Sequence, residues 1–61
     1  MKTTKLEQIA VQYAKEGVNE EVGSITSFSY RNKIYILNKT NEKEFSLYEE
    51  NVFLPINVFC L

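Results

Sequence analysis

The spacing of apolar residues changes once along this 61-residue chain, and the change limits the folds that are open to it. Before Gly17, apolar residues recur at the three- and four-residue intervals that place side chains on one face of a helix. From Ser24 onward, they alternate with polar residues at the two-residue period of strands. One helix followed by several strands predicts an α+β fold.

A helix is predicted over about residues 4–16. Its apolar stripe consists of Leu6, Ile9, Ala10, Tyr13 and Ala14. Thr4 and Glu7 have the spacing of a capping box, in which the Thr4 hydroxyl accepts from the Glu7 backbone and the carboxylate reaches back. Gly17 follows at the position where a helix C-terminus favours a left-handed residue. These signals define both ends of the helix.

Three or four strands of an antiparallel meander are predicted after a connector at Val18–Gly23. Their expected ranges are about 24–31, 34–39, 43–49 and 56–61. One sheet face then carries Phe28, Tyr30, Tyr35, Leu37, Phe45 and Leu47, and it is the natural partner of the helix stripe. The chain is therefore expected to be a single domain over residues 1–61, with its N-terminal helix packed on one face of the sheet.

The register of the meander follows from the expected turns. Asn tolerates positive φ, so Asn32 and Lys33 are predicted as the two loop residues of the first hairpin. Tyr30 then lies opposite Tyr35. In the second hairpin, Phe45 is predicted opposite Leu37.

The segment Val52–Leu61 differs from the earlier strands because eight of its ten residues are apolar, counting Cys60. Residues 56–61 are therefore predicted to form a strand that is buried on both sides. Pro55 cannot donate to a ladder, which indicates an edge strand or a bend. The single Cys60 is expected to be a small core hydrophobe.

The predicted fold has more apolar surface than one helix can cover. Monomers seldom leave such a patch exposed, and small domains without disulfides or metals commonly oligomerise. We therefore expect a homo-oligomer, with a dimer favoured; the alternative is a monomer whose tail closes the sheet into a partial barrel. The candidate self-association residues are Ile25, Ile34, Ile36, Phe53, Ile56, Val58 and Phe59.

The residue types that are missing exclude most catalytic chemistry. Without His, the chain lacks the commonest general base and metal ligand, and without Asp the usual catalytic triads cannot be assembled. A lone Cys has no His to activate it, and structural zinc needs several Cys or His ligands. No glycine-rich phosphate-binding motif is present. We expect no catalytic residue, no cofactor and no metal, and therefore no enzyme.

Charge and hydropathy limit the partners. A net charge of −1 gives no general attraction to nucleic acid, and no apolar run reaches the roughly 18 residues of a membrane-spanning helix. The segment after Met1 lacks a signal-peptide apolar core, so we expect a cytoplasmic protein, in the host cytoplasm if it is viral. The candidate ligand or partner contacts are Arg31, Asn32, Lys33, Lys39, Lys43 and Tyr48.

The leading hypothesis is a small, non-enzymatic, self-associating interaction protein, of the kind found among bacterial and phage accessory proteins that inhibit a host or defence protein by binding it. It depends on size and on missing chemistry rather than on a motif. The alternative is an oligomer that binds an anionic or nucleotide-like ligand between subunits, because the Arg31 fork suits phosphate. A third hypothesis is nucleic-acid binding through the basic turns, with Tyr rings as stacking platforms.

Overall fold

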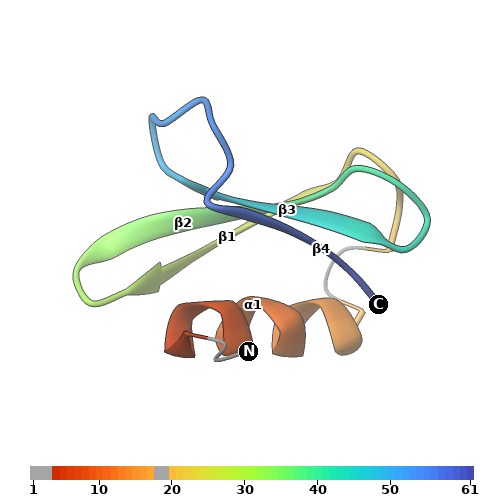
Figure 1. The fold of residues 1–61 in the computed structure, drawn as a ribbon, viewed down its shortest axis with the longest axis horizontal. Helices are drawn as coiled ribbons and strands as arrows, with labels where there is room; N and C mark the ends of the chain where they lie inside the picture. Colours follow the sequence, from red (N-terminus) through yellow and green to blue (C-terminus); the bar gives the residue numbers. More distant parts are fainter. Residues whose placement is uncertain (1–3, 18–19) are drawn as a thin grey trace.

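The computed structural model of the chain describes residues 4–17 and 20–61, so part of the predicted connector Val18–Gly23 lies outside the described residues. The elements follow one another as α1 (Lys5–Lys15), β1 (Ile25–Tyr30), β2 (Lys33–Lys39), β3 (Glu44–Glu49) and β4 (Asn57–Cys60). All neighbouring strands pair antiparallel, in the order β1-β2-β3-β4 (Figure 1). The predicted α+β fold is confirmed.

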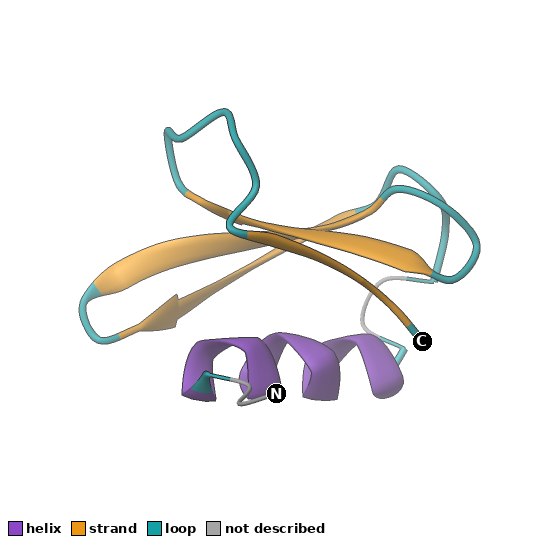
Figure 2. Cartoon of the chain, in the orientation of Figure 1, coloured by secondary structure: helices purple, strands orange, loops and turns teal. Residues whose placement is uncertain are grey.

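The molecule has two layers. Helix α1 lies along one side of the sheet, while the loop of residues 50–56 between β3 and β4 rises on the opposite side (Figure 2). Strands β1 and β4 are the two edges and do not pair with each other. The sheet is open, so the alternative of a tail that closes it into a partial barrel is wrong.

Helix α1 begins at the predicted capping box. The Thr4 hydroxyl oxygen accepts a hydrogen bond from the Glu7 backbone N–H at 3.2 Å, and the Glu7 carboxylate accepts from the Thr4 backbone N–H at 3.2 Å. Such a cap stabilises a helix by about 1 kcal/mol. At the other end, Gly17 has a φ of 75°, a left-handed conformation that costs Gly little.

The core fills the space between α1 and the sheet. Its buried residues are Ala10, Ala14, Phe28, Tyr35, Leu37, Phe45 and Leu47. Leu37 and Leu47 lie opposite each other in β2 and β3 and are both fully buried, which contributes about 1.5–3 kcal/mol for each side chain. The helix-facing side of the sheet is therefore the face that the sequence pattern predicts.

Both predicted registers are wrong by two residues. The turn of the first hairpin consists of Arg31 and Asn32, with φ values of 52° and 64°, so Tyr30 lies opposite Lys33. In the second hairpin, Leu37 lies opposite Leu47 instead of Phe45. Because side chains alternate with a period of two, a shift of two residues leaves every side chain on its predicted face.

Strand β4 is not buried on both sides, which corrects the expectation for the tail. It forms an edge of the sheet, and only Phe59 is half-buried, with its ring stacked 6.1 Å from that of Phe45. Cys60 is exposed instead of lying in the core, because α1 covers only the face to which Phe59 belongs. Pro55 lies in the loop before β4, where its missing N–H disturbs no ladder.

Candidate functional site: the uncovered face of the sheet

The side of the sheet opposite α1, here called the uncovered face, is nearly free of charge. Alternation along the paired strands places on it Ile25, Ser27, Ser29, Ile34, Ile36, Asn38, Glu44, Ser46, Tyr48, Val58 and Cys60. Glu44 is the one ionised side chain in that set, and its carboxylate accepts a hydrogen bond from the Thr40 hydroxyl at 2.9 Å. The remaining side chains are apolar or neutral.

Three apolar side chains of the uncovered face are open to solvent, while Ile36 and Tyr48 are half-buried. Ile25 is 66% exposed, Val58 is 46% exposed and Ile34 is 43% exposed. On the other side of the sheet, Leu37 and Leu47 are fully buried under α1. The two faces of the sheet therefore carry similar apolar residues, but those on the helix side are buried and several on the other side are exposed.

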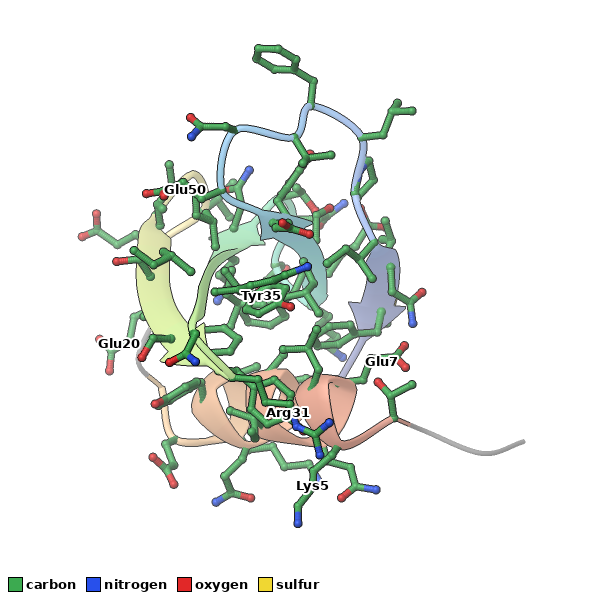
Figure 3. The ribbon with its side chains drawn as sticks, turned by 90° about the vertical axis from the view of Figure 1, so that its left-hand side faces the viewer. Lys5, Glu7, Glu20, Arg31, Tyr35 and Glu50 are labelled. Carbon is green, nitrogen blue, oxygen red and sulfur yellow. The ribbon has the colours of Figure 1, made fainter. Side chains whose placement is uncertain are left out.

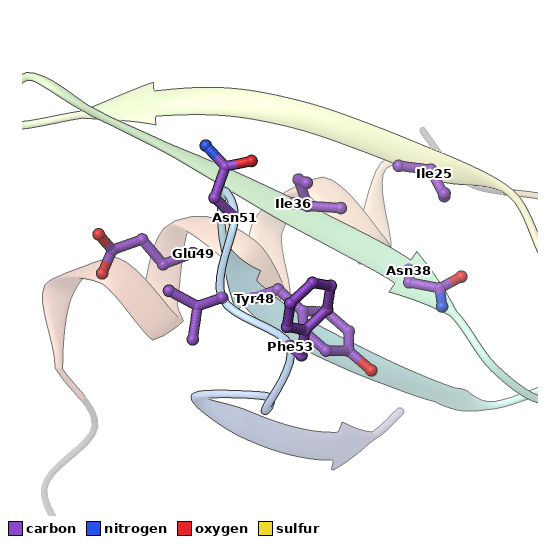
Figure 4. A pocket seen from close by; sticks show the side chains of 8 residues that line it. Ile25, Ile36, Asn38, Tyr48, Glu49, Asn51 and Phe53 are labelled. Atoms are coloured by element: carbon purple, nitrogen blue, oxygen red, sulfur yellow. The ribbon is translucent and has the colours of Figure 1, made fainter.

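A groove of about 450 Å³ lies where the chain leaves β3 and rises from the uncovered face (Figure 4). It is lined by Ile25, Ile36, Asn38, Tyr48, Glu49, Asn51, Val52 and Phe53. A tight turn lifts the chain here: the Val52 N–H donates to the Glu49 carbonyl at 3.0 Å, and Asn51 has a φ of 67°. One wall of the groove is thus the sheet, and the other is the start of the 50–56 loop.

Asn38, which lines this groove, has an unsatisfied polar atom. Its Oδ1 is buried and accepts no hydrogen bond from any described residue. Asn38 lies opposite Ile25 in β1 and opposite Ser46 in β3, within the plane of the sheet. Buried acceptors are normally hydrogen-bonded, so Asn38 Oδ1 is an exception within the sheet.

The loop above the groove carries the most exposed large apolar side chains. Phe53 is 95% exposed and Leu54 is 78% exposed. The Phe53 ring therefore presents nearly all of its apolar surface to whatever approaches the uncovered face.

The residues predicted for self-association mostly gather around this face. Ile25, Ile36 and Phe53 line the groove, while Ile34, Ile56 and Val58 are exposed. Phe59 is the exception, because it packs against the core on the helix side. The sequence pattern did not predict that Asn38, Asn51 and Val52 line the groove. Alternation along β2 could have placed Asn38 on this face. The positions of Asn51 and Val52 depend on the turn at Asn51, which the pattern does not show.

The basic candidate contacts are not brought together. Arg31 and Asn32 form the β1–β2 turn, and Lys33 lies 3.9 Å from the Glu49 carboxylate. Lys39 donates to the Glu20 carbonyl at 2.8 Å, and Lys43 is exposed beyond β2. Of the six candidates, Tyr48 alone lines the groove. The groove therefore lacks the cationic residues that an anionic ligand was expected to contact.

Within residues 4–17 and 20–61, no group of three or more Cys and Glu side chains could hold a metal ion. No helix in the same part of the chain is long and apolar enough to cross a membrane. Comparison of the sequence and fold with protein-family models, curated proteins and solved structures finds no match. The described residues form an exposed, largely apolar sheet face with a groove beside it.

Proposed function

We propose that this chain is a small, non-enzymatic, cytoplasmic protein that self-associates through its uncovered face and acts by occupying a protein partner. One observation carries the proposal: among the described residues only the 50–56 loop lies over part of a largely apolar, nearly uncharged sheet face, which leaves Ile25, Ile34 and Val58 exposed. In a bacterial or phage setting, the corresponding role is inhibition of a host or defence protein. The small size and the missing catalytic side chains support that role.

A second copy of the chain suits this face electrostatically. Two copies packed face to face through a two-fold axis present the same surface to each other, so a face that carried many charges of one sign would repel its copy. Glu44 on the face and Glu49 at the groove are the charged strand residues there, and two carboxylates keep that repulsion small. Two sheets can pack face to face about 10 Å apart, with interdigitating side chains.

The size of the contact is also reasonable. A stable interface buries about 800 Å² on each partner, which is less than a fifth of the 4547 Å² surface of this chain. The groove is a depression beside the sheet, and the exposed Phe53 projects next to it. An apolar side chain from the second copy can therefore enter the groove. Aromatic anchors in such pockets contribute disproportionately to binding.

Sedimentation equilibrium of the wild type and of Val58→Asp tests the proposal. Val58 lies on the uncovered face in β4, and a carboxylate there would be buried in the contact at a cost of several kcal/mol. We expect the wild type to associate at micromolar concentration and Val58→Asp to form a species of lower mass. Circular dichroism checks that the variant keeps its fold.

Val22→Asp is the matched control, because Val22 is 62% exposed in the turn before β1 and lies off the uncovered face. It should sediment as the wild type does. A wild-type species of 7.1 kDa at micromolar concentration contradicts the proposal. So does an equal loss of mass in both variants.

A further inference from the structure

Strand β1 is an edge without the features that normally protect one. Its six residues, Ile25–Tyr30, contain no charge and no Pro, and the strand forms one side of the sheet (Figure 3). Natural edge strands usually carry Lys, Pro or a bulge, because free backbone groups invite pairing with another chain. Ser27 and Ser29 are exposed and have small side chains that leave the backbone accessible.

The backbone groups that β1 offers can be assigned from its pairing with β2. Tyr30 and Lys33 flank the two-residue turn, so they form a hydrogen-bonded pair, and every second residue from Tyr30 bonds to β2. The intervening residues, Ile25, Ser27 and Ser29, direct their N–H and C=O groups away from the sheet. Together they form a complete row of donors and acceptors for one further strand.

Strand β4, the other edge, offers less. It has four residues, and it follows Pro55 and the 50–56 loop. A longer ladder forms more hydrogen bonds, so β1 is the stronger site for strand addition.

Opposite charges lie at the two ends of β1. The exposed Glu20 and Glu21 precede the strand, and the exposed Arg31 follows it in the turn. Among the described residues, neither the Glu21 carboxylate nor the Arg31 guanidinium has an ion-pair partner. An antiparallel copy of the same strand brings the acidic end of one chain to the basic end of the other, twice in each pair.

We propose that β1 is a second self-association site, at which it pairs antiparallel with β1 of a second copy. The register that overlaps both strands most fully places Ser27 opposite Ser27 of the second copy, and Ile25 opposite Ser29. The two-fold axis is then perpendicular to the sheet. The product is an eight-stranded sheet with both helices on one side and the two uncovered faces joined on the other.

This edge contact is distinct from the face contact, and each can form without the other. When both form, two eight-stranded sheets pack face to face with their helices outermost. Four chains in dihedral symmetry, a common arrangement for soluble oligomers, are then expected for the wild type.

Disulfide trapping at Ser27 tests the register. In a Cys60→Ser background, Ser27→Cys should form an intermolecular disulfide on mild oxidation, because paired Cα atoms about 5.5 Å apart suit a disulfide. Ser29→Cys is the matched control: it is exposed on the same face of the same strand but lies about 13 Å from its own copy in this register. Non-reducing electrophoresis should show a cross-linked dimer for Ser27→Cys and little for Ser29→Cys.

Charge reversal tests the ends of the strand. Arg31→Glu alone and Glu21→Arg alone should each weaken the edge contact about tenfold, since two like-charge pairs replace two opposite ones in every dimer. The double variant Arg31→Glu/Glu21→Arg restores both opposite-charge pairs. Made in the Ser27→Cys protein, it should recover most of the cross-linking. Two single losses without recovery in the double variant overturn the proposal.

Val58→Asp separates failure of the edge contact from failure of the proposed function. If both contacts form, Ser27→Cys/Val58→Asp still cross-links, but as a dimer instead of a larger species. An associated protein that cross-links equally through Ser29→Cys, or through neither, overturns the edge contact and leaves the face contact intact. Cross-linking through Ser27→Cys that is insensitive to Val58→Asp, with no larger species in the wild type, supports the edge contact and contradicts the face contact.

Discussion

Glu7 connects the start of the helix to the last strand through hydrogen bonds of a single carboxylate. It accepts from the Thr4 hydroxyl at 2.7 Å and from the Thr4 backbone N–H, and also from the Asn57 side-chain amide. These bonds hold the pKa of Glu7 below its ordinary value of 4.5, with the Thr4 hydroxyl contributing most, the Asn57 amide next and the Thr4 backbone third. The charged form of Glu7 is therefore favoured in the folded chain.

The lowered pKa predicts how stability depends on pH. Because the folded pKa lies below the unfolded one, the stabilisation by Glu7 is fully present above pH 4.5 and is lost as the pH falls through the folded pKa. We expect Glu7→Gln to lower Tm by about 2–4 °C at pH 7, since the cap is weakened but not removed. The difference in Tm from the wild type should shrink below pH 4.5.

Glu42→Gln is the control for that measurement. Glu42 is exposed in the β2–β3 turn, and no described residue bonds to its carboxylate. Thermal melts followed by circular dichroism should give the same pH profile for this variant as for the wild type. A Glu7→Gln difference that stays constant down to pH 3 would contradict the role assigned to the carboxylate.

The β1–β2 hairpin shows what a pattern can and cannot predict. The faces of Phe28, Tyr35 and Leu37 follow from alternation alone, and they are correct. The register depends on which two residues adopt positive φ, and the chain offers Arg31-Asn32-Lys33 without a Gly to mark the turn. In the observed register, the centroid of the Phe28 ring lies 5.1 Å from that of Tyr13 and 5.9 Å from that of Tyr35. No local sequence signal predicts these ring contacts.

The conformation of this turn gives a stability prediction. Asn32 has a φ of 64°, and Gly adopts this conformation more readily than Asn. We expect Asn32→Gly to raise the free energy of unfolding by about 0.3–1 kcal/mol, measured by urea denaturation. Asn41→Gly is the control: the Asn41 carboxamide oxygen accepts from the Glu42 N–H at 2.6 Å, so losing that side chain should destabilise the protein. Equal effects would contradict the argument from φ.

The candidate site was predictable to a similar extent. Ile25, Ile36 and Val58 are identified by their parity within strands, because the face opposite the helix stripe must carry them. The prediction that residues 56–61 are buried on both sides was wrong, because an apolar run does not show whether another element packs on each side of the strand. The groove was missed because it depends on the Asn51 turn, whose φ of 67° is a property of the folded chain.

The whole molecule has a small core for its length, and this predicts concentration-dependent stability. Seven of the described residues make up the buried cluster, and a 61-residue domain buries only about 60% of the surface that its unfolded chain exposes. Association stabilises the folded state by mass action. We expect Tm to rise by about 3–6 °C for each tenfold increase in protein concentration.

Differential scanning calorimetry over a hundredfold concentration range measures this rise. Val58→Asp should show a smaller slope than the wild type, because it removes one of the proposed contacts. A Tm that is independent of concentration for the wild type would show that the monomer has its full stability alone.

The contact between Asn57 and Glu7 also bears on the order in which the chain folds. The pairings β1–β2, β2–β3 and β3–β4 all join neighbours in sequence, so each hairpin can close quickly over a short loop. The bond between Asn57 and Glu7 instead spans 50 residues. During synthesis α1 emerges before β4, so the capping carboxylate is exposed first and receives its second partner only when β4 docks. Helix formation can therefore precede completion of the sheet.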